Sequence, residues 1–386
     1  MKGSCLIITP EYPPMVIGGP GHHMYHLASG LAQNGWKITV VCFHRGPTIS
    51  WASEAGVSVI RVPVPSLLPA DYVAKYLYQS DWIEHSVDPR EIVDSPKKGL
   101  VISQGYFLGR VARRWAIALN WPLITHSASL LSTSFEAPVT DKQFMLQEER
   151  SLYQAGAVTI APSEWLRNEI CRLCNVDPTV VRVIPKAIRI ASFQPWHEPP
   201  GEPIITYIGR LSPEKGVHVL VQAMADVVRD VPKAKLRLVG VASDGEYLQL
   251  LRSLIYKYDL NSSIFFWGGV AETDLPSIYQ STQIVAIPSI HESFGRVAIE
   301  AMAAGRPVVA SAIEGLEEVV KADECGVLVP VNDPSQLAAA VVDLLLQPLQ
   351  AVEIGKRAAD KVKRYDWDQV LPETELVYRK VLNHEL

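Results

Sequence analysis

Short apolar runs alternate with amphipathic stretches along the whole chain. In order they occupy 5–9, 37–43, 57–64, 99–103, 122–126, 157–163, 181–185, 203–209, 234–240, 264–269, 283–289, 306–312 and 325–330. Continuous runs of Val, Ile and Leu are typical of parallel strands that helices cover on both faces. The pattern therefore predicts an α/β protein with two doubly wound, Rossmann-like parallel sheets.

A proline-rich stretch without periodicity, 193–203, separates the two sets of runs. We predict a first domain over 1–195, a second over 196–365 and a terminal helix over 366–386 that packs back on the first domain. A length of 386 residues exceeds the usual size of one core, which favours two domains. Ligands of open α/β sheets bind beyond the carboxyl ends of the strands, so we expect the chemistry in a cleft between the domains.

Composition and charge narrow the possible partners. The formal net charge of -5 argues against nucleic acid, because proteins that bind phosphate backbones usually carry a basic excess. Five cysteines, an odd number, suit a reducing cytoplasm, and Cys171 and Cys174 have no second pair to complete a zinc site. The chain has no run of 18 apolar residues. We expect a cytoplasmic protein, with peripheral contact at the inner face of the membrane as an open alternative.

The first stretch with chemical potential follows the first strand. Gly18 and Gly19 lie where a loop opens a helix, and glycines there let an anion approach free N–H groups. The dinucleotide pattern G-x-G-x-x-G fails because Met24 stands at its third glycine. A phosphate site and a plain structural turn both remain open.

The second stretch is "GRLSPEKG", which follows a strand and precedes a helix. Arg210 and Lys215 flank its turn, and a guanidinium with an ammonium is a common pair for gripping a diphosphate. The alternative is a solvated loop in which Lys215 and Glu214 lie in water and contribute little.

The third stretch is "HESFGRVAIEAM", where another strand meets a helix. Glu292 lies in the loop, 294–297 leave unpaired N–H groups at the helix start, and Glu300 follows in its first turns. A carboxylate can accept two hydroxyl hydrogen bonds, as the acidic residue of nucleotide-binding folds does with ribose. The stretch therefore predicts recognition of a polyol and a phosphate.

Together these stretches resemble the GT-B retaining glycosyltransferases of family four, the glycosyl transferases group 1. The resemblance spans nearly the whole chain and rests on the Gly18-Gly19 loop, on Gly209–Gly216 and on the E-x7-E pattern from Glu292 to Glu300. It implies two Rossmann-like domains that face a cleft, and a nucleotide-sugar donor bound mainly by the second domain.

The resemblance also implies a role for single residues. Arg210 and Lys215 would bind the donor diphosphate, Glu292 the sugar hydroxyls and Glu300 the ribose. His126 matches a family histidine near the transfer site, although a lone histidine at a strand end is more often structural. The implied catalytic set is His126, Glu292, Arg210 and Lys215, and the implied donor-binding set is Gly18, Gly19, Arg210, Lys215, Trp267, Glu292, Phe294, Gly295, Arg296, Val297 and Glu300.

Two departures and one decoy accompany the resemblance. Lys186-Ala187 stands where the family often has Asn-Gly, and Arg296 stands where an aliphatic residue is usual. Arg296 could bind phosphate or an anionic acceptor, or point into solvent. Asp366-Trp367-Asp368 spells the D-x-D of metal-binding transferases, but it precedes the terminal helix, where we expect Asp368 to be the N-cap. We assign no metal.

Acceptor recognition would fall to the first domain. The aromatic-rich segment 66–85 reads as neither a clean strand nor a clean helix and could cover an acceptor or touch a lipid surface. Arg110, Arg113 and Arg114 lie close together and could meet anionic head groups. The alternative is a solvated helix with a packed Trp115.

The resemblance implies transfer of a hexose of the glucose type from a nucleoside diphosphate sugar, most often UDP-linked, to a glycan, glycolipid or lipid-linked acceptor. It implies retention of configuration without an enzyme nucleophile, no metal and no cofactor, because the donor is a substrate. Two alternatives stay open: a sugar-nucleotide epimerase with the same two-domain form, and a sugar-nucleotide-binding protein without turnover.

Overall fold

The computed structural model describes residues 2–16, 18–65, 72–93, 98–131, 142–195, 201–320 and 325–385. They divide into two compact units. The first unit takes the chain up to Pro185 and from Asp368 onward, and the second unit takes Lys186–Trp367. The second unit thus begins before the proline-rich stretch, because Ile188 is buried in its core and the Ile188 N–H donates to the Tyr365 carbonyl at 3.0 Å.

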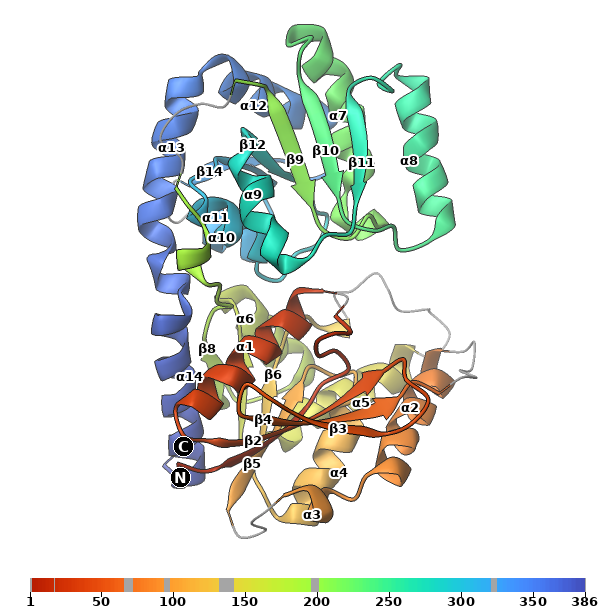
Figure 1. The fold of residues 1–386 in the computed structure, drawn as a ribbon, viewed down its shortest axis with the longest axis vertical. Coiled ribbons are helices and arrows are strands. Elements are labelled where there is room, and N and C mark those ends of the chain that lie inside the picture. Colours follow the sequence, from red (N-terminus) through yellow and green to blue (C-terminus); the bar gives the residue numbers. More distant parts are fainter. Residues whose placement is uncertain are drawn as a thin grey trace. The chain divides into compact units, whose positions relative to one another are not determined.

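The first unit is built on an eight-stranded sheet (Figure 1). Its spatial order is β3-β4-β2-β1-β5-β6-β7-β8, and all neighbours are parallel except β3 and β4. The strands are β1 (Ser4–Ile8), β2 (Lys37–His44), β3 (Ser50–Glu54), β4 (Val57–Pro63), β5 (Gly99–Gln104), β6 (Leu123–His126), β7 (Val158–Ala161) and β8 (Val181–Val183). Each parallel strand overlaps one of the apolar runs of the sequence to within one residue at its start.

Strand β3 was not predicted, and it pairs antiparallel to β4 at the edge of the sheet. Ala55 and Gly56 form a two-residue turn between the two strands, with φ of 49° and 80°. Positive φ at both central residues is the mark of the hairpin turn that matches strand twist. The sequence hides this strand because its residues are only partly buried and mostly polar or small.

Helices cover both faces of the first sheet. Residues of alternate register such as Leu6, Ile8, Val41 and Phe43 share a core with residues of α2 to α5. The C-terminal helix packs against α1, where a Cβ on Gly30 would meet Leu371 at 2.6 Å. The helices are α1 (Gly19–Gln33), α2 (Tyr72–Ser86), α3 (Pro89–Ile92), α4 (Gly109–Leu119), α5 (Lys142–Ala155), α6 (Glu164–Cys174) and α14 (Trp367–Leu382).

The second unit is built on a six-stranded sheet whose neighbours are all parallel (Figure 1). The spatial order is β11-β10-β9-β12-β13-β14, so chain order reverses between β9 and β12. The strands are β9 (Ile204–Ile208), β10 (Lys235–Val239), β11 (Ile264–Gly268), β12 (Ile284–Ile287), β13 (Val308–Ser311) and β14 (Gly326–Val329). Such a reversal is a topological switch point, where ligands of these folds bind.

Two cores lie on opposite faces of this sheet. Ile205 and Leu236 pack with residues of α7, α8 and α12, whereas Val285 and Val308 pack with residues of α10, α11 and α13. The helices are α7 (Val217–Asp230), α8 (Gly245–Lys257), α9 (Leu275–Gln280), α10 (Arg296–Ala303), α11 (Glu314–Val320), α12 (Pro334–Leu346) and α13 (Pro348–Lys361). The prediction of two doubly wound parallel sheets is confirmed, with β3 as the antiparallel addition.

The start of α14 corrects one expectation. The helix begins at Trp367, so Asp366 precedes it and Asp368 lies in its first turn. Asp366 accepts the Ile190 N–H at 3.0 Å. The predicted N-cap at Asp368 is therefore wrong by position, because Trp367 already belongs to the helix.

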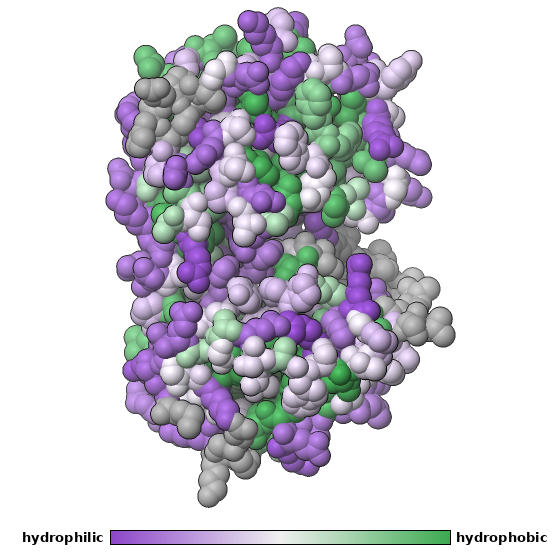
Figure 2. Space-filling model, viewed as in Figure 1, coloured by the Kyte–Doolittle hydropathy of each residue, from purple (hydrophilic) through white to green (hydrophobic). Residues whose placement is uncertain are grey.

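In the described ranges no single helix is long and apolar enough to cross a membrane; α12 passes such a test only together with 348–365, at a bend of 100°. The described residues also contain no group of three His, Cys, Asp or Glu side chains placed to hold a metal ion. Hydrophilic residues cover most of the face seen in Figure 2, with apolar side chains showing between them.

Candidate functional site

Two loops meet at the switch point of the second sheet. The loop after β9 ends at Gly216, which has a φ of 63° and is the N-cap of α7. A Cβ there would lie 1.9 Å from the Pro288 carbonyl oxygen, so only glycine lets the two loops approach this closely. The Glu214 carbonyl also accepts the Ile290 N–H at 2.9 Å. The "GRLSPEKG" and "HESFGRV" stretches, distant in sequence, thus form one surface.

An ion pair joins these loops. Lys215 Nζ lies 2.8 Å from Glu292 Oε2, and both side chains are about three-quarters buried. Burial opposes ionisation of Glu292, but the charge and hydrogen bond of Lys215 outweigh it, and the pKa of Glu292 falls below its usual value. Lys215 is therefore paired with Glu292 rather than solvated beside Glu214. Glu214 instead lies 3.4 Å from Arg210, whose side chain is 38% exposed.

Glu314, which was not among the predicted site residues, supports this pair. Its carboxylate accepts the Glu292 N–H at 2.9 Å and lies 2.8 Å from His291 Nδ1. Its φ of 40° is uncommon for a residue with a side chain and signals local strain. Gly315 beside it lies so close to Ser293 that an added Cβ would be 2.3 Å from the Ser293 carbonyl oxygen. The only signal in the sequence is an acidic residue before a glycine after β13.

A second charged cluster surrounds Glu300, which is 3% exposed. Tyr279 donates its hydroxyl to Glu300 Oε2 at 2.9 Å, and Arg296 Nε lies 2.8 Å from Oε1. Burial raises the pKa of Glu300 above its ordinary value, although Arg296 and Tyr279 pull it part of the way down. Arg296 also pairs with Glu272 of the 3-10 turn Glu272–Asp274.

The two sequence departures are electrostatic neighbours. Burial, followed by repulsion from Arg296, lowers the pKa of Lys186 to about 8. The Arg296 side chain is 19% exposed and paired with two carboxylates, so the alternative that it points into solvent is wrong.

The other residues of the predicted donor-binding set differ in their surroundings. Gly295 has a φ of 101° and precedes α10, and Phe294 is buried with its ring against Tyr365. Val297 is partly buried against the same core. Trp267 lies on the edge strand β11, is 54% exposed, and carries the Arg237 guanidinium 4.5 Å from its ring centre. From the region of β11, the contact with α10 is made by Glu272, which follows the strand and pairs with Arg296.

The candidate residues of the first unit make fewer ion pairs than those of the second unit. The Gly18 N–H donates to the Glu11 carboxylate at 3.1 Å, so a carboxylate lies at the loop expected to hold phosphate. His126 ends β6 and is 2% exposed, and its Nε2 lies 2.7 Å from the Tyr378 hydroxyl of α14. Its role in catalysis stays a prediction.

The two segments predicted to contact an acceptor or a lipid surface form regular helices in their described residues. Residues from Tyr72 onward form the regular helix α2, where Tyr78 and Trp82 stack and are partly exposed, while 66–71 lie outside the described residues. Arg113 pairs with Glu148 at 2.7 Å and Arg114 pairs with Glu84. Trp115 is buried. The helix thus has a packed Trp115, and two of its three arginines pair with carboxylates. Contact of these arginines with anionic head groups stays a prediction.

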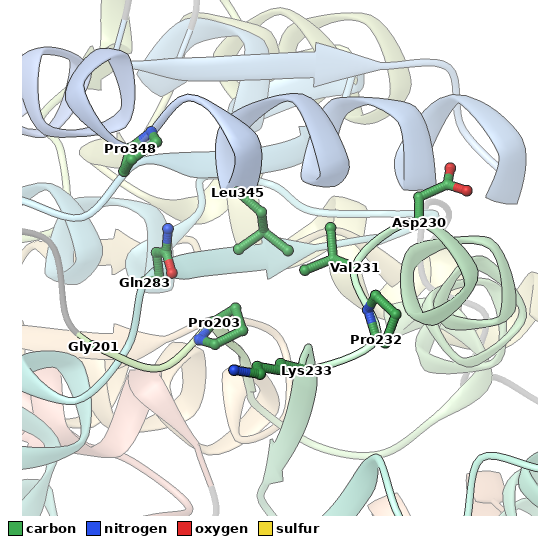
Figure 3. A pocket seen from close by; sticks show the side chains of 9 residues that line it. All are labelled: Gly201, Pro203, Asp230, Val231, Pro232, Lys233, Gln283, Leu345 and Pro348. Carbon is green, nitrogen blue, oxygen red and sulfur yellow. The ribbon is translucent and has the colours of Figure 1, made fainter.

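A separate pocket lies at the opposite end of the second sheet (Figure 3). Its lining includes Pro203 before β9, Gln283 before β12 and Lys233 before β10, with Leu345 of α12. These are the amino ends of the strands, whereas the paired charges described above follow the carboxyl ends. The pocket is therefore distinct from the switch-point site.

Two Rossmann-like units, with paired cations and carboxylates at the switch point of the second, have the architecture of a GT-B protein. Residues 189–361 match the family Glycosyl transferases group 1, and residues 18–187 match the family described as Glycosyl transferase 4-like domain. A D-inositol 3-phosphate glycosyltransferase of Kineococcus radiotolerans is 30% identical over 73% of this chain and 72% of that protein. The chain belongs to the glycosyl transferases group 1 and has the GT-B fold.

Solved structures agree on the fold. Sucrose-phosphate synthase from Thermosynechococcus elongatus has a TM-score of 0.86 at 24% identity, with 99% of this chain and 100% of that chain covered. The Anabaena protein HepE, solved in complex with UDP-glucose, has a TM-score of 0.75 at 20% identity, with 97% and 99% covered.

Proposed function

We propose that this glycosyltransferase transfers a hexose of the glucose type from a UDP-linked sugar to a glycan, glycolipid or lipid-linked acceptor, with retention of configuration. The observation that carries the proposal is the Lys215–Glu292 pair at the switch point, with Arg210 on the same loop. HepE, which binds UDP-glucose, supports the choice of UDP.

The charges suit the parts of such a donor. Arg210 and Lys215 would stabilise the negative charge that grows on the leaving diphosphate, which is the step that benefits most from fixed cations. The N-terminus of α10 adds N–H groups that favour a phosphate. Because Arg210 and Lys215 supply this positive charge, we propose a reaction without metal or cofactor.

The carboxylates suit the hydroxyls. Glu292, kept ionised by Lys215, would accept hydrogen bonds from the sugar. Glu300 would accept those of the ribose, and Trp267 would lie toward the base. The acceptor hydroxyl would lose its proton to the leaving phosphate on the same face of the sugar, with His126 near the transferred group. We place this reaction at the cytoplasmic side, where the exposed Tyr78 and Trp82 could touch a lipid-linked acceptor.

Binding tests the donor assignment. Calorimetry with UDP, GDP and ADP should show preferential binding of UDP, and Arg210→Ala should weaken it roughly tenfold or more, as expected for a lost charged hydrogen bond. Arg229→Ala is the matched control, because Arg229 lies exposed on α7 among its own acidic neighbours. Absence of any nucleotide binding would refute the donor class.

Turnover separates the alternatives. A transferase releases UDP from a UDP-sugar only when an acceptor is consumed. An epimerase converts the donor sugar without any acceptor, and a binding protein yields no product at all. Product analysis of UDP-glucose with and without a panel of glycan and lipid-linked acceptors therefore decides among the three.

A further inference from the structure

Arg296 occupies an unusual position among charged groups in the second unit. It is the first residue of α10 and meets Glu300 one turn later on the same helix. It also meets Glu272, which lies in the segment between β11 and α9. One guanidinium therefore joins two elements through two carboxylates, and its fork of donors suits such bridging better than an ammonium does.

The two carboxylates depend on that bridge. Two carboxylates that share a site cannot both stay ionised without a cation, because their like charges force one of them to take up a proton. Glu300 is the more buried of the pair, at 5% side-chain exposure against 30% for Glu272. Loss of Arg296 would therefore neutralise Glu300 first.

The bridge also fixes how Glu300 is oriented. Arg296 holds Oε1 and the Tyr279 hydroxyl holds Oε2, so each carboxylate oxygen has one partner within the unit. Each oxygen keeps a second lone pair that can accept a hydrogen bond from a ligand hydroxyl. The arrangement leaves Glu300 immobile yet still able to accept.

We propose that Arg296 is a positioning residue for nucleotide recognition: it holds Glu300 ionised and oriented toward the ribose hydroxyls and tethers the segment after β11 to the start of α10. This inference rests on the proposed function, because it requires a nucleotide ribose at Glu300. The groups that face the carboxylate are Arg296, Tyr279 and Glu272, with Lys186 acting on Arg296 as a second cation.

The test compares UDP with 2′-deoxy-UDP by calorimetry from pH 6 to pH 8.5. Wild-type protein should prefer UDP roughly tenfold or more, as expected for a hydrogen bond to a charged group. In Arg296→Leu the preference should shrink, most strongly at pH 6, because loss of the cation raises the pKa of Glu300 and a protonated carboxyl accepts poorly. The preference should recover at pH 8.5. Arg229→Leu, an exposed control, should keep the wild-type preference at every pH.

Two further variants keep the test decisive if Arg296→Leu does not fold. Arg296→Lys keeps the charge but loses the fork, so we expect a partial, severalfold loss of ribose preference. Glu272→Gln leaves the bond between Arg296 and Glu300, so its preference should stay close to that of the wild type and should not depend on pH.

Several outcomes would overturn the proposal. An unchanged ribose preference in Arg296→Leu, or in Arg296→Lys if only that variant folds, removes the positioning role. Equal weakening of UDP and 2′-deoxy-UDP at all pH values would mean that Arg296 serves only the fold. If wild-type protein binds neither nucleotide, the proposed function fails together with this inference, and wild-type binding without ribose preference refutes the inference alone.

Discussion

The two units hold their candidate residues in different ways. In the second unit, charged pairs gather at the switch point: Lys215 meets Glu292 of another loop, and Arg296 meets Glu300 of its own helix and Glu272 of another segment. In the first unit, His126 is buried against a tyrosine hydroxyl and Gly18 is held by Glu11. The difference suggests a division of labour: the charges of the second unit are already in place for an anionic ligand, and such preorganised charges need no rearrangement at the moment of reaction.

Among the substitutions considered, removal of the Lys215 side chain should have the largest effect on transfer. Lys215→Ala leaves Glu292 without its cation and the leaving diphosphate without a fixed charge, so transfer should slow by about 100- to 1000-fold. Initial rates of UDP release measure this. Lys356→Ala, an exposed lysine of α13, is the control and should be as active as the wild type. A loss below tenfold would show that the pair serves only structure.

Variants of Glu314 test whether the positive φ at this position strains the backbone and whether the Glu314 carboxylate supports transfer. Glu314→Ala removes the partner of His291 and of the Glu292 N–H, so transfer should fall about tenfold, as for a lost hydrogen bond to a charged group. Glu314→Gly should be equally slow. Its free energy of unfolding, measured by urea denaturation, should exceed that of the alanine variant by about 1 kcal/mol, because glycine adopts positive φ without strain. Equal stability of the two variants would argue against strain at this position.

The first unit should respond in stability rather than in donor binding. Tyr378→Phe removes the hydroxyl beside buried His126 and should lower the free energy of unfolding by about 1 kcal/mol. UDP affinity, measured by calorimetry, should not change. Weaker UDP binding in this variant would mean that the first unit also shapes the donor site.

Lys186 should affect how stability depends on pH rather than donor binding or transfer. Its pKa is about 8 in the folded protein, below the ordinary value of 10.5, so between these values the unfolded chain binds more protons. Stability due to this residue should therefore rise as pH increases from about 8 to 10.5. Urea denaturation of wild type and Lys186→Met isolates this contribution. The free energy of unfolding of the wild type should rise with pH relative to that of Lys186→Met. A constant difference would contradict the shifted pKa.

Much of the fold was predictable because its strands are buried on both faces. Continuous apolar runs such as 37–43 and 283–289 are typical of parallel strands. Strand β3 escaped because an edge strand buries too little to show a pattern, and its turn is Ala55-Gly56 rather than a pair of strong turn formers. The start of α14 escaped because helix ends depend on local bonds such as that of Asp366.

The site was predictable only in part, for a related reason. Arg210, Lys215, Glu292 and Glu300 lie at strand ends or helix starts, which sequence pattern locates well. Their partners Tyr279, Glu272 and Glu314 come from other elements, and no periodicity joins residues so far apart. Charge pairing across loops is a property of the folded sheet.

The central claim is that the cations of the second unit bind the donor diphosphate. Calorimetry of UDP and of uridine, with wild-type protein and with the Arg210→Ala/Lys215→Ala double variant, tests it most directly. The double variant should lose most of the wild-type preference for UDP over uridine, while its affinity for uridine equals that of the wild type. An unchanged affinity for UDP, or an equal loss for both ligands, would contradict it.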